Sequence, residues 1–237
     1  MIDIATVDFT VDAPPLGQQR LTDRANQLFD SWDSHLTSSL PLSDYYLRFE
    51  LAEGSLKGKG KVAVVAGALY AGIAGFGSFM SGVHEIANIS RSAGDYLLRE
   101  ADVQLVHDRR HPVRGRKSAA QLAQLEGLFV RVRRGELSPH EATVLADDIF
   151  ADEGQLPRGF RDALHAAIED IPRRAKQLDL ELGYPEVAAG EAGVGEPMPK
   201  RDRRVPPIPP IPPPARFRVE VWRQSKKDPR HIHVEPL

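Results

Sequence analysis

The segment "GKGKVAVVAGALYAGIAGFGSFMSGVHEI", residues 58–86, differs in composition from the rest of the chain. It carries no charge from Val62 to Val83, is rich in Gly and Ala, and is preceded by Lys57, Lys59 and Lys61. An α-helix over 62–83 spans about 33 Å, against about 30 Å for the hydrocarbon core of a bilayer. The length therefore predicts a helix that crosses a membrane, or one that is buried in a soluble assembly.

Small and bulky residues of this segment fall on opposite faces of the expected helix. One face is a bulky stripe: Val65, Leu69, Ile73, Phe76, Met80 and Val83. The other face carries small residues that let helices approach closely in a membrane: Gly67, Ala71, Gly75, Ser78 and Gly82. In a pore, the small face packs or lines the lumen and the stripe meets lipid. In a soluble oligomer, the same helix is buried at subunit contacts, and this alternative stays open.

The hydrophobic periods elsewhere predict an α+β protein. Alternation around Val7–Val11 and Tyr45–Leu51 predicts two strands, and a helical period over 18–38 predicts a helix between them. We expect five parts: a small N-terminal β-α-β unit (1–56), the Gly-rich helix and its extension (57–100), a basic helical region (101–182), a Pro-rich linker (183–214) and a β tail (215–237).

Turn and cap signals refine the second half of the chain. Ser138 and Glu141 form a capping box that starts a helix, and "VPPIPPIPPP", residues 205–214, predicts a stiff polyproline II spacer. The alternation of Phe217, Val219 and Val221 predicts a strand with no partner nearby in sequence. We expect that strand to join a sheet elsewhere in the chain or in a neighbouring subunit.

The composition excludes several classes of function. The chain has 237 residues, a formal net charge of −2 and no cysteine, so it has neither a global basic field nor a thiolate metal site. Its N-terminus lacks a basic region followed by an apolar run, so we expect no signal peptide. Phosphate-loop, dinucleotide-binding and nucleophile-elbow motifs are incomplete. We expect no enzyme and no cofactor.

Histidines near charged residues do not predict a metal site. His107 and His111 are four residues apart, but two arginines lie between them and Pro112 follows. The pair His231 and His233 is expected on an exposed strand.

Clustered cations are the strongest binding signal in the chain. Five of them fall within residues 109–117, a segment that Pro112 and Gly115 predict to be a loop, and more follow in the next helix. Such clusters suit phosphate groups, although a solvated charged loop is the alternative. No aromatic residue lies among them for base stacking. The candidate anion-binding residues are Arg109, Arg110, Arg114, Arg116, Lys117, Arg131, Arg133 and Arg134.

The stretch "FELAEGSLKGKGKVAVVAGALYAGIAGFGSFMSGVHEI" resembles segments of small bacterial membrane effectors of anti-phage defence. In outline it is similar to Hailong-type channel subunits, which are gated by single-stranded oligodeoxynucleotides from a partner nucleotidyltransferase. The resemblance implies an entry turn over Glu53–Lys57, a pore helix over 62–83 and an oligonucleotide held by basic residues.

The sequence signals predict a homo-oligomeric, pore-forming ion channel gated by an anionic ligand, and the resemblance implies a role in antiviral defence and a nucleotide or oligonucleotide as that ligand. We expect it in the inner membrane, with cytoplasmic domains, and the resemblance implies single-stranded nucleic acid and a nucleotidyltransferase as partners. The alternative is a cytoplasmic, soluble oligomeric scaffold or binding subunit of a defence or toxin complex.

Overall fold

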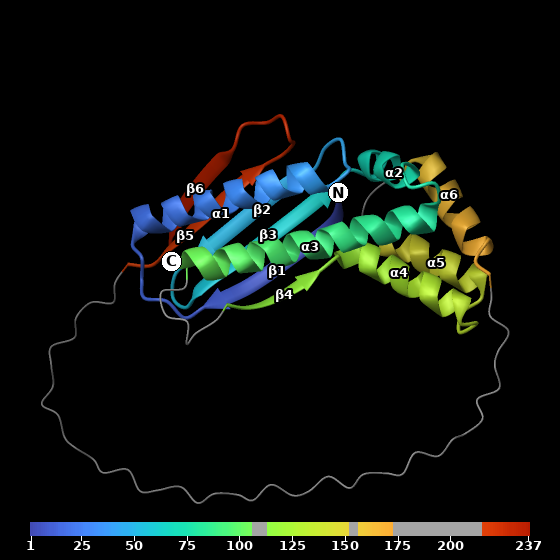
Figure 1. The fold of residues 1–237 in the computed structure, drawn as a ribbon, viewed down its shortest axis with the longest axis horizontal. Helices are drawn as coiled ribbons and strands as arrows, with labels where there is room; N and C mark the ends of the chain where they lie inside the picture. Colours follow the sequence, from blue (N-terminus) through green and yellow to red (C-terminus); the bar gives the residue numbers. More distant parts are fainter. Residues whose placement is uncertain (106–112, 152–155, 173–214) are drawn as a thin grey trace, which may run out of the picture.

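A six-stranded antiparallel sheet organises the protein (Figure 1). The computed structural model describes residues 1–105, 113–151, 156–172 and 215–237. The strand order is β4-β1-β3-β2-β5-β6, and every neighbouring pair is antiparallel. The strands are β1 (Ile2–Val11), β2 (Tyr46–Ala52), β3 (Leu56–Val64), β4 (Arg114–Ser118), β5 (Phe217–Arg223) and β6 (His231–Pro236).

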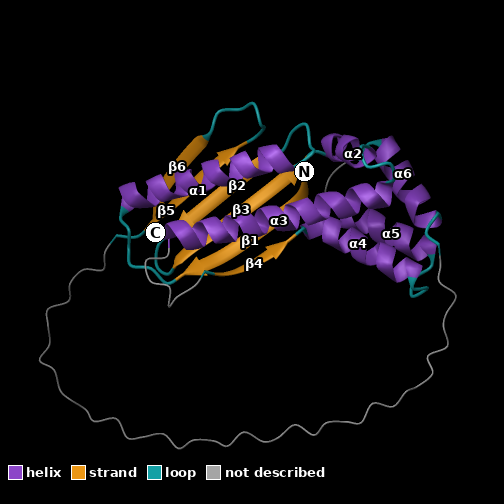
Figure 2. Cartoon of the chain, in the orientation of Figure 1, coloured by secondary structure: helices purple, strands orange, loops and turns teal. Residues whose placement is uncertain are grey.

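Two long helices, α1 (Gln18–Ser39) and α3 (Phe79–Leu105), lie across one face of the sheet (Figure 2). Their apolar faces and the inward residues of the strands form the core, in which Trp32 Nε1 donates to the Ala93 carbonyl at 3.0 Å. The other helices gather beyond one end of the sheet: α2 (Ala66–Ala74), α4 (Ala120–Arg133), α5 (Pro139–Ile149) and α6 (Arg158–Glu169). The predicted α+β class is confirmed.

The segment "LKGKGKVAV" is strand β3, not the start of a helix. Its glycines have a packing reason, because they face the core where aromatic rings already fill the space. A Cβ on Gly58 would lie 2.0 Å from the Phe9 ring, and one on Gly60 would lie 2.8 Å from Trp32. The predicted domain boundary at residue 56 is therefore wrong, since it falls where β3 enters the same sheet as β1 and β2.

The predicted continuous helix over 62–83 is also wrong. Val62–Val64 belong to β3, and the remainder forms α2 and the start of α3, which meet at an angle of 110°. No single helix of the described ranges is long and apolar enough to span a membrane, whereas α2 and α3 pass that test as a bent pair. The bend prevents the small residues of the segment from sharing one helix face.

The predicted small face separates into residues with different surroundings. Gly67 has open space around it, and Ala71 and Ser78 are exposed. Gly75 is the C-cap of α2, and Gly82 in α3 packs on the backbone of Ile73 in α2. From the bulky stripe, Leu69, Ile73 and Val83 are fully buried inside the protein.

The C-terminal segment is a hairpin of β5 and β6, and β5 pairs with β2 of the same chain. This confirms the predicted strand. Of the two locations expected for its partner, the strand pairs within its own chain and not with a neighbouring subunit. The exposed strand predicted at His231 and His233 is confirmed as part of β6. The capping box of Ser138 and Glu141 is confirmed at the start of α5. The predicted linker, 183–214, lies outside the described residues.

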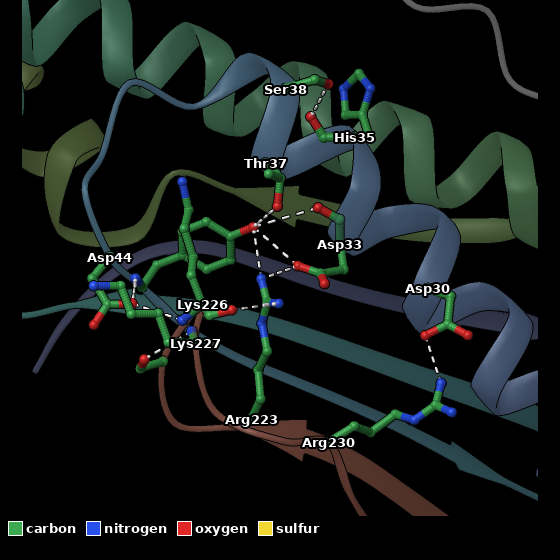
Figure 3. Close-up of polar contacts among 12 residues, drawn as sticks. Asp30, Asp33, His35, Thr37, Ser38, Asp44, Arg223, Lys226, Lys227 and Arg230 are labelled. Atoms are coloured by element: carbon green, nitrogen blue, oxygen red, sulfur yellow. Dashed lines mark hydrogen bonds and ion pairs between the residues drawn. The ribbon is translucent and has the colours of Figure 1, made fainter.

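A polar network fixes this hairpin to α1 and to the loop before β2 (Figure 3). Arg223 forms an ion pair with Asp33 and donates to Tyr45 Oη at 3.1 Å. Tyr45 Oη lies 3.0 Å from Asp33 Oδ1, to which it donates, and Lys226 Nζ donates to the Leu42 carbonyl at 2.8 Å. Burial, with the nearby charge of Asp33, raises the pKa of Tyr45 to about 12.

A buried carboxylate, Glu53, secures the start of the hairpin. Glu53 Oε1 accepts from the backbone N–H groups of Leu16 and Gly17, just before α1, at 2.9 and 2.7 Å. Its other oxygen accepts from the Phe217 N–H at 3.2 Å. One side chain therefore joins the end of β2, the start of α1 and the start of β5.

Candidate functional site

The face of the sheet opposite α1 and α3 exposes polar and charged side chains. Because successive strand residues point to opposite faces, the buried residues Val7 and Phe9 of β1 alternate with the exposed Asp8 and Thr10. In β3 the same alternation exposes the lysines and buries the glycines between them. We call this surface the open face.

Four cations on the open face surround a shallow groove. The strand register places Arg114 of β4 and Lys57 of β3 on either side of Thr10 in β1. It likewise places Arg116 and Lys59 on either side of Asp8. The groove has a volume of ≈ 330 Å³, and these side chains line it. We name Lys57, Lys59, Arg114 and Arg116 the cation quartet.

A second groove of ≈ 310 Å³ continues the first across β3 toward β2. The two grooves share Asp8 and Lys59, and the second adds Arg48, Glu50 and Lys61. Together they form a strip that crosses β4, β1, β3 and β2. A strip of this kind presents charge along a line rather than at a single point.

Ion pairs neutralise the charges at the β2 side of the open face. Arg48 Nη2 lies 2.6 Å from Glu220 Oε1, and this hydrogen bond raises the pKa of Arg48. Arg218 Nε lies 3.2 Å from Glu50 Oε1. Lys61 Nζ lies 2.8 Å from Asp3 Oδ2. These pairs reduce the net charge of this part of the surface.

The cation quartet differs from its neighbours, because its members form no ion pair with any residue in the described ranges. Asp8, between Arg116 and Lys59, is the carboxylate nearest in register. The groove therefore offers four N–H-donating cations against one carboxylate. This donor set suits oxyanions, above all phosphate groups.

Comparisons with protein-family models, curated proteins and solved structures found no match.

The predicted anion-binding residues do not form one cluster. Arg114 and Arg116 line the groove, but as residues of a strand, so the predicted basic loop is wrong at Arg114–Ser118. Lys117 points to the other face and pairs with Asp95 of α3. Arg109 and Arg110 lie outside the described residues.

The remaining predicted cations lie at the end of α4, outside the groove. Arg131 and Arg133 are in its last turn, and Arg134 is its C-cap. Arg134 Nη1 lies 3.7 Å from Glu136 Oε1, and Arg131 Nε lies 4.0 Å from Glu136 Oε2. These weak, exposed contacts leave the α4 cations as a separate basic surface.

Lys57 and Lys59 were missed as binding residues, because the sequence placed them at the start of a membrane helix. Their signal was the alternation of Lys and Gly over 57–61, which has the period of a strand. Glycine is depleted in strands and so weakened that interpretation. Only the positions of Phe9 and Trp32 show why glycine is required there.

No group of three metal-ligating side chains occurs within the described ranges. His107 and His111, the pair with metal-like spacing, lie outside them.

Proposed function

We propose that the open face binds nucleic acid through its phosphate backbone. The observation that carries this proposal is the cation quartet, four cations without ion-pair partners in the described ranges that surround one groove. The sequence predicted the same class of ligand. Of the residues it predicted to bind that ligand, only Arg114 and Arg116 belong to the cation quartet.

The shape of the charged surface favours a polymer over a single phosphate. Neighbouring strands lie about 4.8 Å apart, so the cations from β4 to β2 extend over roughly 14 Å. A nucleic acid backbone presents regularly spaced anions over that length, and each neutralised phosphate releases counterions. The binding free energy therefore comes mainly from the backbone, and this groove alone gives little base preference.

The test is the salt dependence of binding to a short, fluorescently labelled oligo(dT), measured by anisotropy. Four phosphate contacts predict a log–log slope of about −3, since each contact contributes about −0.7 for single strands. Replacing Lys59, Arg114 and Arg116 together by Gln should flatten the slope by about two units.

A matched control comes from α4. Replacing Arg131, Arg133 and Arg134 by Gln removes the same charge, but it should leave the slope unchanged. Equal effects of the two triple variants, or no binding by the wild type at low salt, would contradict the proposal.

A membrane pore is a second candidate, supported by the composition of the bent pair α2–α3. To reach lipid, this pair would have to withdraw Leu69, Ile73 and Val83 from the core. Flotation with liposomes, with and without oligo(dT), tests the idea, and a protein that stays unbound in both samples rejects it. Homo-oligomerisation, the defence role and the nucleotidyltransferase partner stay predictions.

A further inference from the structure

An aromatic residue from the C-terminal hairpin lies on the open face. Val219 and Val221 of β5 are fully buried against the helices, so Trp222 points to the opposite side. The Trp222 ring stacks on the His231 ring of β6, with centroids 5.5 Å apart and planes inclined by 25°. Trp222 is partly exposed and His231 is exposed.

The strand register connects this ring pair to the charged strip. Trp222 lies opposite Arg48 in β2, and Arg48 lies opposite Lys61 in β3. Trp222 is therefore one strand spacing, or about 5 Å, from Arg48 at the β2 end of the grooves. The chain separates Trp222 from these residues by more than 150 positions, so the sequence alone could not place it there.

We propose that Trp222, supported by His231, stacks on a base of the nucleic acid and makes the open face selective for single strands. This inference rests on the proposed function. An indole ring stacks on any base, because every base has a π-face. In a duplex the bases already stack on one another, so the ring has no base to contact. The grooves hold phosphates, and the ring pair holds a base at one end of the strip.

The support of His231 fits this role. Its ring stacks against one face of the indole. Within the described ranges, the cations that lie over aromatic rings are Arg223 and Lys226 above Tyr45, and none lies above Trp222. The second face of the indole therefore has no cation to displace before a base can stack on it.

The test compares oligo(dT) with an abasic strand of the same length, which keeps the phosphates and lacks the bases. Wild-type protein should bind oligo(dT) roughly tenfold more tightly, the effect of stacking one base. Trp222→Ala should abolish that difference and leave the salt slope unchanged. Trp222→Phe, which keeps an aromatic ring, should retain most of it.

Tryptophan fluorescence gives a second readout. The chain has two tryptophans, and Trp32 is fully buried and hydrogen-bonded in the core. Quenching by oligo(dT), but not by the abasic strand, should therefore report Trp222 and should disappear in Trp222→Phe.

Three outcomes would overturn the inference. In the first, the wild type binds the two strands equally. In the second, Trp222→Ala weakens both strands by the same factor, which indicates a loosened hairpin rather than lost stacking. Polyglutamate that competes as well as oligo(dT) would identify a general polyanion surface and also overturn it. If neither strand binds at low salt, the proposed function itself fails.

Discussion

At the scale of single residues, the ion pair of Arg223 and Asp33 joins the C-terminal hairpin to α1. Their side chains are 11% and 19% exposed, and both contact Tyr45. A charge left without its partner at this depth loses solvation that nothing replaces. The pair therefore fixes the hairpin to α1 more firmly than an exposed ion pair would.

Asp33→Asn should lower the free energy of unfolding by about 2–3 kcal/mol, because it leaves Arg223 partly buried and without a counterion. Urea unfolding measures the change. The control is Asp30→Asn, one turn earlier on α1, whose pair with Arg230 has side chains 61% and 37% exposed. The free energy of unfolding of that variant should fall by less than about 1 kcal/mol. Equal losses in the two variants would show that the burial of an ion pair does not change its contribution to stability.

Ionisation of Tyr45 lowers the stability of the folded protein at alkaline pH. Burial raises its pKa to about 12, against about 10 in an unfolded chain. The folded state therefore keeps a proton that the unfolded state releases, and this contribution is complete below about pH 10 and is lost as the pH rises toward 12. The stability advantage of the wild type over Tyr45→Phe should shrink across that range in urea titrations. A constant difference between the two proteins would refute the assignment.

At the scale of elements, the corner between α2 and α3 decides how the Gly-rich segment is understood. Residues 62–83 have helical composition and spacing, yet they supply the end of a strand, a short helix and the start of another. Composition did not reveal the bend, at which Gly77 adopts a φ of 78° and Gly82 of α3 meets the backbone of Ile73. A contact of that kind is tertiary and leaves no local pattern.

Other elements were predictable because their signals are local. The amphipathic period of α1 and the capping box of α5 both specify structure within a few turns. Half of the cation quartet was predictable in the same way, since Arg114 and Arg116 belong to an evident basic cluster. The other half was not, because β1 alone brings Lys57 and Lys59 beside them.

Substitutions at two glycines distinguish the bent pair from a straight packing helix. Gly82→Ala would place a Cβ 2.5 Å from the Ile73 carbonyl oxygen, so it should cost about 1–3 kcal/mol. Gly67→Ala meets nothing within 4 Å and should stabilise the protein by roughly 0.5–1 kcal/mol, because alanine favours a helix. Thermal unfolding of both variants measures this. A straight helix that used both glycines at one interface would show losses in both.

At the scale of the whole molecule, the C-terminal hairpin completes both the core and the open face. Val219 and Val221 are buried beneath α1, while Arg218, Glu220 and Trp222 extend the open face. The hairpin thus connects stability to the proposed binding function. Losing it should affect both.

Removing residues 215–237 should lower the unfolding midpoint by roughly 10 °C or more. The loss includes two buried valines, at about 1.5–3 kcal/mol each, and the anchoring ion pair. The shortened chain should also self-associate in light scattering, because β2 becomes a free edge. Ile232→Ser, at an exposed position of β6, is the control and should melt like the wild type. An unchanged midpoint after truncation would mean that the hairpin is only appended.

The pairing of β2 with β5 has a consequence for biosynthesis. Leu51 and its partner Val219 are separated by most of the chain, so β2 leaves the ribosome long before β5 exists. At about 5–20 residues per second, the interval is roughly 10–30 seconds. During that time the nascent chain carries an unsatisfied strand edge, a surface to which chaperones or other growing chains can attach. Synonymous codon changes that slow translation between residues 52 and 217 should lengthen this exposure and lower the yield of native protein without altering its sequence.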